Sequence, residues 1–509
     1  MSPNRREFIK VVVAGAVAAG CPVDLSVLAQ AATGTPAVDS ENNKICHEVR
    51  DGFQFSLPPV SKKHEVIIVG GGVSGLTSAY LLQKYDFLLL EKEPHWGGNA
   101  FEMQYHGATY GTGSAFVESP AAAELAVEIG LQPLPIDNWD GTIIKGEFVP
   151  DFWGEGLDHA PYPVNVRDDF KKFKKDMLAI DLEKRGRELD NVPLTRLLKD
   201  HSVELRQWWD TYCPSNWGGL AHDVAALVAV EDFQGFAGDS RKDTRSTWPG
   251  GLGAITNKLA EVLAPKFADR MLTGATIIAV VPQRNGVNVT YSSGRGELKT
   301  VAAKGVIMAT PKFITRRLVA GLPEKQSEAM KKIRYAPYPV VNLIFDKPVF
   351  NKGYDTWCPG NSFTDFIVAD WVIRNQPGYE QKYNILSCYT PMRETERATL
   401  LTDDGARRVA RNVTRDFQKL FPGAEPVEVH IYRRGHPMYI VSPGLYTDIQ
   451  PIVRQPMERI FFANTDAEGP VSTTSTGIAA ARRAVKELEV ALSGGAKHAK
   501  LAEPVSAVL

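Results

Sequence analysis

Three glycines and one carboxylate stand at a spacing that has a definite chemical use. The glycines form the pattern Gly70-x-Gly72-x-x-Gly75, and the carboxylate, Glu91, follows 21 residues after the first of them. Glycines so spaced allow a tight turn, close approach of the backbone to a pyrophosphate, and close packing of a helix on a strand. A helix that begins at the turn offers its N–H groups to the pyrophosphate, and an acid at this distance accepts hydrogen bonds from a ribose.

The residues around these groups predict the elements that position them. Val66 to Val69 are β-branched throughout, which is typical of a strand buried on both faces. An amphipathic stretch from Ser74 to about Lys84 predicts a helix, and Phe87 to Leu90 predicts a second strand that leads into Glu91. A glycine triplet alone is weak evidence, but here strand, helix, strand and acid all have the required spacing. NAD and FAD both use this Rossmann unit, so other segments must decide between them.

The composition predicts a folded protein of two or three domains. The chain has 509 residues, of which 44% are hydrophobic and 23% are charged. Its formal net charge of −1 argues against nucleic acid as a partner, because phosphate-binding domains usually carry a marked basic excess. The sequence contains no run of roughly 18 apolar residues, so we expect no membrane span.

The cysteines and histidines form no metal-binding pattern. The ten histidines include no HExxH motif, and the cysteines include no CxxC pair, so we expect no metal. Disulfides are possible but cannot be paired. Cys46-His47 could attach a haem or a flavin, but without CxxCH the better interpretation is an N-terminal arm packed over a domain surface. The five cysteines are Cys21, Cys46, Cys213, Cys358 and Cys388.

The N-terminus has the layout of an export signal. Arg5-Arg6 is followed by Phe8, Lys10 and a short apolar run from Val11 to Ala19, which resembles a twin-arginine signal peptide. An ordinary first helix with two chance arginines is the alternative. The resemblance implies a periplasmic protein delivered by the twin-arginine translocation machinery, which exports folded proteins with the cofactor already inside.

Two cleavage sites compete in this segment. Ala29-Gln30-Ala31 is an A-x-A site, and we favour it narrowly. Ala18-Ala19-Gly20-Cys21 resembles a lipoprotein box with a weak first residue, which leaves lipid anchoring at Cys21 open.

A second glycine-rich segment identifies a family. Lys92-Glu93-Pro94-His95-Trp96-Gly97-Gly98-Asn99 places a Gly-Gly doublet six residues beyond Glu91, and Gly111-Thr112-Gly113-Ser114 follows. Such a doublet is the second fingerprint of the flavin amine oxidase superfamily, which includes protoporphyrinogen oxidases and phytoene-type desaturases. The chain resembles this superfamily over residues 64–492, strongly at both ends and weakly over 120–245. The resemblance implies FAD rather than NAD, because glycines there admit a second phosphate and the flavin edge.

Three later segments carry the rest of the resemblance. The segment from Trp248 to Ala254 is similar to the one that re-enters the FAD domain, and the segment from Arg433 to Tyr439 is similar to the returning strand that borders the flavin. The segment from Arg459 to Asp466, followed by Ser472 to Thr476, leads into a predicted helix from Gly477 to Leu492. By resemblance, the N-terminus of this helix faces the pyrimidine end of the flavin and stabilises the negative charge of the reduced form.

The resemblance implies an α/β fold: a Rossmann-like FAD-binding domain of the glutathione-reductase type with an interleaved α+β substrate domain. The expected division is a signal peptide (1–31), an arm (32–63), the FAD-binding domain in three parts (64–125, 248–312 and 431–492), a helical substrate-domain insertion (126–247), the substrate-domain sheet and helices (313–430), and a flexible tail (493–509).

The two fingerprints and the resemblance assign the cofactor-binding residues. Thr276 and Ile277 are placed near the adenine, and Thr465 or Asp466 takes the place of the usual acidic residue toward the ribitol. The complete set is Gly70, Gly72, Val73, Ser74, Gly75, Glu91, Lys92, Gly97, Gly98, Asn99, Gly113, Ser114, Thr276, Ile277, Thr465, Asp466, Ser472 and Thr473.

Inside the substrate domain, the charged run from Asp168 to Lys175 predicts a solvated helix face. Trp208, Trp209 and Trp217 are interpreted as core, with a substrate tunnel as the alternative. Further along, 340–345 and 385–389 predict strands, and 403–420 predicts an amphipathic helix.

The chain lacks two features of amine-oxidising members. These place a lysine on a substrate-domain strand, where it holds a water at flavin N5, but the strand from Tyr338 to Phe345 has none. They also place an aromatic residue in the closing segment, where this chain has Thr473. These absences favour a largely apolar small molecule as substrate. His436, Tyr439 and Tyr338 are the candidate catalytic groups near the flavin face, and an ordinary hydrogen-bonded strand residue is the alternative for each.

The leading interpretation is an exported FAD-dependent oxidoreductase. A substrate C–H bond gives a hydride to flavin N5, and O2 or another acceptor reoxidises the flavin. The alternatives are a flavin-dependent isomerase or mutase without net redox change, and a non-catalytic exported FAD-binding protein.

Replacing Arg5-Arg6 by Lys-Lys tests the export signal. The pathway reads the guanidinium pair, and lysine lacks that planar fork, so we expect the precursor to remain in the cytoplasm. Fractionation of a bacterial host measures this, and an unchanged periplasmic yield in the double variant rejects the signal.

Overall fold

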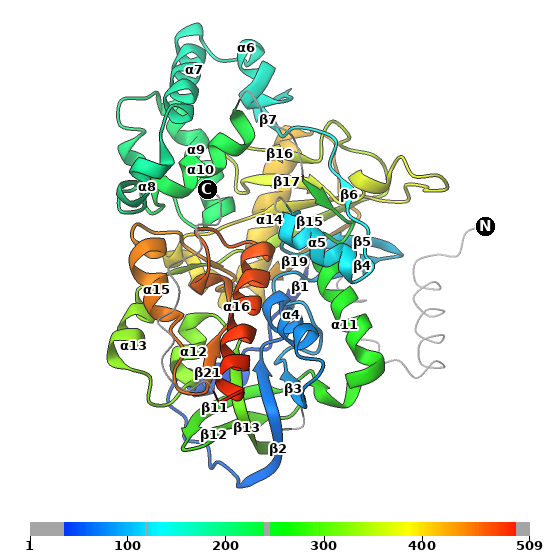
Figure 1. The fold of residues 1–509 in the computed structure, drawn as a ribbon. Coiled ribbons are helices and arrows are strands. Elements are labelled where there is room, and N and C mark those ends of the chain that lie inside the picture. Colours follow the sequence, from blue (N-terminus) through cyan, green and yellow to red (C-terminus); the bar gives the residue numbers. More distant parts are fainter. Residues whose placement is uncertain (1–34, 118–119, 239–244, 295, 495–509) are drawn as a thin grey trace, which may run out of the picture.

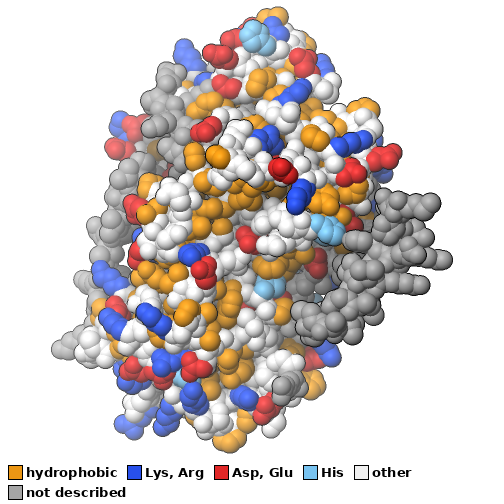
Figure 2. Space-filling model, turned by 90° about the vertical axis from the view of Figure 1, so that its right-hand side faces the viewer, with side chains coloured by type: hydrophobic (Ala, Val, Ile, Leu, Met, Phe, Trp, Pro, Cys, Tyr) orange, Lys and Arg blue, Asp and Glu red, His pale blue; other side chains and the backbone are white. Residues whose placement is uncertain are grey.

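The computed structural model describes residues 35–117, 120–238, 245–294 and 296–494, which fold around two large sheets (Figure 1). The predicted signal peptide, both cleavage sites and residues 495–509 of the predicted tail lie outside the described residues. No helix in the described ranges is long and apolar enough to cross a membrane. Acidic and basic side chains are interspersed on the face shown in Figure 2.

The first sheet contains the strand that carries the glycine triplet and combines three separate segments of the chain. In spatial order it consists of β10 (Met271–Leu272), β3 (Phe87–Leu90), β2 (Val60–Val69), β13 (Leu298–Met308), β12 (Gly286–Ser292) and β11 (Thr276–Gln283), with β21 (Ile460–Phe462) paired to the end of β13. The strands β10, β3, β2, β13 and β21 are parallel, whereas β11, β12 and β13 form an antiparallel meander.

Both faces of β2 are buried, as its β-branched residues predict. Val66 and Ile68 pack on one side, and Ile67 and Val69 pack on the other. Three helices cover the first of these faces (Figure 1): α4 (Val73–Leu81), α11 (Gly253–Phe267) and α16 (Thr474–Leu492).

The second sheet is built largely from the segments predicted to form the substrate domain. In spatial order it contains β1 (Ala37–Ser40), β19 (Glu428–Arg433), β15 (Val340–Phe345), β18 (Asn384–Tyr389), β17 (Asp365–Val368), β16 (Asp355–Trp357), β7 (Gly141–Ile144) and β8 (Glu147–Val149). Residues Val341, Leu343 and Phe345 point toward α14 (Asp403–Leu420) and share its hydrophobic core. Because side chains alternate along a strand, Val340, Asn342 and Ile344 face the opposite way, toward the loops of the first sheet.

A group of helices adjoins the second sheet at the upper left of Figure 1: α7 (Val164–Leu178), α8 (Leu182–Asp190), α9 (Val203–Trp217) and α10 (Ala226–Ala237). Trp208, Trp209 and Trp217 are fully buried there, so the prediction that they are core is confirmed. Their rings pack in one aromatic cluster with Tyr212 and, on the second sheet, Trp357. Most charged residues of the predicted run are exposed on α7, namely Asp168, Lys171, Lys172 and Lys175, while Phe170 and Phe173 are buried, which confirms the solvated face.

The remaining elements connect these layers. The helices are α3 (Lys44–Arg50), α5 (Pro120–Glu128), α6 (Leu157–His159), α12 (Lys312–Leu318), α13 (Glu324–Lys331) and α15 (Gln450–Val453). The short helical turns are η1 (Phe152–Gly156), η2 (Leu194–Arg196), η3 (Ala268–Arg270), η4 (Trp371–Ile373), η5 (Glu394–Leu401), η6 (Leu445–Ile449) and η7 (Thr465–Ala467). Three strand pairs complete the fold: β4 (Glu102–Tyr105) with β5 (Ala108–Gly111), β6 (Leu134–Pro135) with β9 (Ser246–Thr247), and β14 (Tyr335–Ala336) with β20 (Met438–Tyr439).

The predicted fold class is confirmed, and the differences are local. The second strand of the glycine unit, β15 and α14 have the predicted bounds, whereas β2 begins at Val60 rather than Val66 because its first half pairs with β13. The helix α16 begins at Thr474 rather than Gly477, because the Thr473 side chain accepts a hydrogen bond from Thr476 N and caps it. The arm also contributes a strand, since β1 pairs in parallel with β19.

Candidate cofactor and substrate site

The carboxyl ends of four parallel strands meet at one edge of the first sheet. Val69 on β2 is in register with Leu90 on β3 and with Met308 on β13, which is in register with Phe462 on β21. The loops that follow these residues carry the glycine triplet, Glu91 and the segment from Thr465 to Asp466. In open α/β sheets, ligands bind outside the carboxyl ends of the strands. The sheet therefore brings the three predicted cofactor segments to one place.

The three glycines of the first motif have different roles. A Cβ at Gly75 would lie 1.8 Å from the carbonyl oxygen of Gly70, and a Cβ at Gly70 would lie 2.7 Å from the carbonyl oxygen of Ala309. These two glycines therefore permit α4 to pack against β2 and β13. A Cβ at Gly72 would come no nearer than 3.7 Å to a protein atom, the Cα of Gly98. The protein itself leaves room at Gly72, so the requirement for glycine there comes from what approaches it.

The first turn of α4 is open to an anion. Within the described part of the chain, Ser74 N donates no hydrogen bond, whereas Gly72 forms a parallel bridge with Gly97 and Leu76 N donates to Gly72 O. The Ser74 hydroxyl donates to Gly477 O at 3.0 Å, which brings the start of α16 beside the start of α4. Two helix N-termini thus converge next to the glycine loop, where their dipoles favour negative charge.

The Glu91 carboxylate lies under the glycine loop. Its oxygens accept hydrogen bonds from Gly71 N at 2.5 Å and from Glu93 N at 2.8 Å. Burial raises the pKa of Glu91, and the bonds from these two N–H groups act in the opposite direction. Each oxygen keeps a second lone pair, so the group can still accept from a ribose hydroxyl.

The predicted adenine residues lie beside the same loop. Gly274 N donates to Glu93 O at 2.8 Å and Ala275 N donates to Glu91 O at 2.7 Å, so that Thr276 and Ile277 follow directly. The amine of Lys92 pairs with Glu93 and, at 3.8 Å, with Glu41 of the arm. Lys92 therefore ties the arm to the loop in this structure, and its contact with cofactor stays a prediction.

The loop with the Gly97-Gly98 doublet packs against the glycine loop that follows β2. Gly98 has a φ of +58°, and a Cβ there would lie 3.1 Å from the Cα of Gly72, so only glycine allows the two loops to meet. A Cβ at Gly113 would lie 2.1 Å from the carbonyl oxygen of Asn99, which also accepts from Ser114 N at 3.4 Å. The Asn99 side chain donates to Pro437 O at 2.6 Å.

The segment before α16 divides into a capping part and a buried part. Thr473 caps the helix, and the hydroxyls of Ser472 and Thr465 lie 3.5 Å apart. Asp466, by contrast, is completely buried, and one of its oxygens lies 2.7 Å from the amine of Lys312. Its other oxygen accepts from Lys312 N at 2.7 Å and from the Tyr335 hydroxyl at 2.5 Å.

This buried ion pair was missed by the sequence analysis. The hydrogen bonds of Asp466 within the protein join α12, β14 and η7. Its contact with the ribitol of the cofactor stays a prediction. Burial lowers the pKa of Lys312, and the adjacent carboxylate opposes the shift. The one signal in the sequence is that Lys312 follows shortly after a buried strand, and this does not identify its partner.

The second sheet carries a row of side chains in register, and Tyr389 in this row reaches the cradle, by which we mean the glycine loops around Gly72, Gly98 and Gly113. Trp357 is in register with Asp365, Asp365 with Tyr389, and Tyr389 with Val340. The Tyr389 hydroxyl donates to Gly113 O at 2.6 Å, which fixes the row against the second fingerprint.

Tyr338 joins this row through a buried hydrogen-bond chain. Its hydroxyl lies 2.7 Å from Ser215 Oγ, which donates to Asp365 at 2.7 Å. Thr364 Oγ1 donates to the same carboxyl oxygen at 2.6 Å. Burial raises the pKa of Asp365 to about 7, and the two hydroxyl donors oppose that shift. The sequence analysis named Tyr338, whose contact with a flavin stays a prediction, and missed Ser215 and Asp365, which lie in distant segments of the chain.

The other two candidate catalytic residues, His436 and Tyr439, lie in the segment that pairs with residues 335–338, since Tyr338 N donates to Arg434 O at 3.0 Å and Tyr335 pairs with Tyr439. The half-buried ring of His436 packs on Phe313 with centroids 4.6 Å apart, and burial together with Arg397 lowers its pKa to about 4. His436 is therefore neutral at physiological pH. Tyr439 is buried and pairs across the strands with Tyr335, beside the Asp466 ion pair. Their contact with a flavin stays a prediction.

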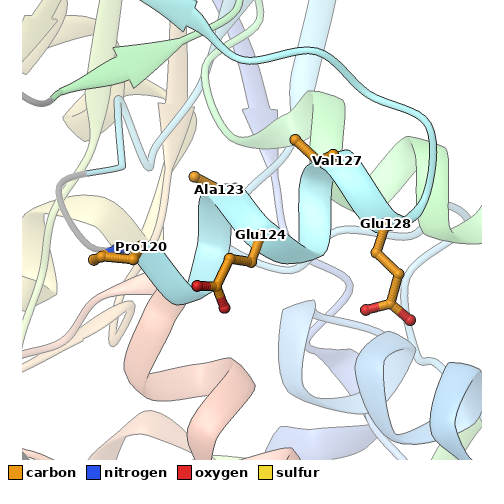
Figure 3. A pocket seen from close by; sticks show the side chains of 5 residues that line it. All are labelled: Pro120, Ala123, Glu124, Val127 and Glu128. Carbon is orange, nitrogen blue, oxygen red and sulfur yellow. The ribbon is translucent and has the colours of Figure 1, made fainter.

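Two further features lie outside this site. Cys46, Cys213, Cys358 and Cys388 are all free thiols in the structure. A shallow surface hollow on α5, shown in Figure 3, is lined by Pro120, Ala123, Glu124, Val127 and Glu128. Its only acidic groups are two glutamates on one helix, so it lacks convergent polar groups from several elements.

The comparisons with known proteins agree with this geometry. Residues 73–488 match the family model described as flavin containing amine oxidoreductase. The chain belongs to this family. FAD is therefore its cofactor, and the protein is an FAD-dependent oxidoreductase. The glycine cradle, the free N–H group of Ser74 and the Glu91 carboxylate fit that cofactor.

The relatives are distant but span most of the chain. The oxidoreductase PigB of Serratia is 24% identical over 82% of this chain and 75% of its own length. Human flavin-containing amine oxidase B is 22% identical over 84% of this chain and 86% of its own. Among solved structures, putrescine oxidase bound to putrescine has a TM-score of 0.64 at 18% identity, covering 84% of this chain and 99% of its own. Cyclohexylamine oxidase from Brevibacterium oxydans has a TM-score of 0.65 at 17% identity, with the same coverage.

Replacing Gly72 by valine tests the cradle. The protein leaves space for the new Cβ, so the chain should fold, but the branched side chain would occupy the region that the pyrophosphate approaches. We expect a soluble, colourless apoprotein where the wild type is yellow. Flavin released by denaturation and quantified by chromatography measures the outcome.

Gly235→Val is the matched control. Gly235 lies exposed on α10, and a Cβ added there would meet no neighbouring atom within 4 Å, so this variant should keep full flavin content. Equal flavin in the Gly72 variant and the wild type would contradict the assignment.

Replacing Asp466 by asparagine tests the buried ion pair. The substitution leaves the Lys312 amine buried without its counter-charge, and we expect a loss of about 3–5 kcal/mol in the free energy of unfolding. The double variant Lys312→Met, Asp466→Leu removes both charges and should recover part of this loss. Denaturant unfolding measures both, and a double variant no more stable than the single one would refute a charge effect.

Proposed function

We propose that this chain is an exported oxidoreductase that removes a hydride from a C–H bond of a largely apolar small molecule. FAD held by the glycine loops and Glu91 would supply the hydride acceptor at N5, and O2 or another acceptor would reoxidise it. Export rests on the twin-arginine pattern, including Arg5-Arg6 and the apolar run after it.

The proposal of a largely apolar substrate rests on one face of β15. The face of β15 that points toward the cradle presents Val340, Asn342 and Ile344, and all three are buried. The amine-oxidising members that the sequence resembles hold a water at N5 with a lysine on this strand. The Asn342 side-chain oxygen accepts from Ser387 at 2.6 Å, whereas its Nδ2 is buried without a hydrogen-bond partner among the described residues. Asn342 is neutral, so this face of β15 presents no cationic amine in the place of the lysine.

The closing segment supports the same conclusion. Thr473 serves as the N-cap of α16 and has no aromatic ring for a cation–π contact, which contributes roughly 0.5–2 kcal/mol. His436, with its pKa lowered to about 4, is the neutral imidazole at neutral pH and does not act there as an imidazolium acid. Apolar and aromatic side chains would exclude water from the substrate, because Val340, Tyr338 and Tyr389 pack in one buried cluster.

A second candidate function is the oxidation of an amine, and the position of Asp365 favours it. This carboxyl lies two strands from Val340, roughly 10 Å across the sheet. A buried carboxyl at that distance could bind the ammonium group of an amine whose C–H bond reacts over β15. The similarity to putrescine oxidase and cyclohexylamine oxidase gives this candidate further support.

Anaerobic loss of the oxidised flavin absorbance separates the candidates. The purified holoprotein is mixed with apolar neutral compounds and with primary amines, and the reduction rates are compared. We expect the neutral compounds to reduce the flavin faster. Rapid reduction by a simple primary amine, at rates well above those for every neutral compound, would overturn the proposal.

The variant Asp365→Asn adds an internal comparison. If the main proposal holds, Asp365→Asn changes the apparent binding of neutral compounds little. If Asp365 binds the ammonium group of an amine, the variant removes its counter-charge and the amine binds at least tenfold more weakly.

Conversion of a compound without flavin bleaching and without an acceptor would indicate an isomerase or mutase instead.

A further inference from the structure

We infer that Arg434 supplies a buried counter-charge to the anionic part of the bound FAD. The sequence analysis places the segment from Arg433 to Tyr439 beside the flavin by resemblance but gives Arg434 no role of its own. The inference rests on its contacts, its burial and the charges around it.

The guanidinium of Arg434 lies inside the second fingerprint. It donates to the carbonyl oxygen of Thr112, to Thr112 Oγ1 at 3.0 Å and to Gly98 O at 3.3 Å. Its Nη1 atom would lie 3.2 Å from a Cβ on Gly113. The group therefore lies between the Gly-Gly doublet and the Gly113 loop, both predicted to contact cofactor.

The side chain is held rigidly in this position. Arg434 is 2% exposed, and its guanidinium stacks on the ring of Tyr432 at 4.1 Å from the centroid. The backbone is fixed too, since Tyr338 N donates to Arg434 O at 3.0 Å. A planar, preorganised donor of this kind suits an oxyanion.

The positive charge has no carboxylate partner within the described ranges. No acidic oxygen there lies within 4.0 Å of the guanidinium. The nearest acids that act on it, Glu41 and Glu93, both pair with Lys92 instead. Burial lowers the pKa of Arg434, yet a guanidinium stays protonated in proteins.

An unpaired buried charge is costly, so its presence points to an anion that binds here. FAD offers two: the pyrophosphate, and the flavin ring when it is reduced. A guanidinium could pair with either of these anions. The two cases differ in what a binding or redox measurement would show. A charge on the pyrophosphate strengthens FAD binding in either redox state. A charge at the ring strengthens binding of the reduced state more and therefore raises the reduction potential.

The test compares Arg434→Gln, Arg434→Lys and Arg433→Gln in the full chain. Arg433 is the matched control, because its guanidinium pairs with Asp403 at 2.9 Å and donates to Leu400 O, away from the fingerprint. The control changes the net charge by the same amount one residue away. The FAD dissociation constant of the apoprotein and the flavin reduction potential are measured for each variant.

We expect Arg434→Gln to weaken FAD binding at least tenfold if the charge meets the pyrophosphate, or to lower the reduction potential if it meets the ring. Arg434→Lys keeps the positive charge but lacks the planar set of guanidinium donors, so it should give an intermediate effect. This variant still tests the inference if the glutamine variant does not fold. Arg433→Gln should match the wild type. An unchanged dissociation constant and potential in a folded Arg434 variant, or equal changes in the Arg433 control, would overturn the inference.

Discussion

The close approach of α4 to the ends of β2 and β13 is the constraint on which the site depends. At Gly75 a Cβ would lie 1.8 Å from a backbone oxygen, a separation that side chains cannot adopt. Only this packing places the first turn of α4 against the loops that follow β3, β13 and β21. The cofactor cradle is thus a consequence of helix–strand packing, and the second fingerprint completes it by bringing Gly98 against Gly72.

Charge is distributed unevenly around this cradle. Lys312 and Asp466 compensate one another in a fully buried pair that links segments 154 residues apart. Such a pair contributes little net stability compared with apolar residues, but losing one partner leaves a buried charge behind. Arg434, in contrast, is buried with neutral hydrogen-bonding groups and an aromatic ring around it. The first arrangement pairs both charges within the protein, and in our proposal the anionic part of FAD supplies the counter-charge for the second.

The substrate side differs from the cradle in chemistry. The row from Val340 through Tyr389 to Asp365 combines apolar surface with one buried carboxyl, whose pKa is raised to about 7 by burial. The hydroxyls of Ser215 and Thr364 partly stabilise its charged form. In the proposed function this row contacts a neutral molecule, and the protonation state of Asp365 would set how well it accepted a cationic one.

The sequence by itself determined the elements and the cofactor unit. Val66 to Val69, the strand 87–90 and the helix 403–420 were predictable because hydrophobic periodicity and glycine spacing are local properties of the chain. Tertiary structure alone decided the Lys312–Asp466 pair, the position of Arg434 and the alignment of Asp365 with Tyr389. Arg434 and Gly98 are 336 residues apart, and each side chain is ordinary in its local context. Their pairing depends on how two sheets pack and on which groups become buried, and neither property is expressed in the spacing of neighbouring residues.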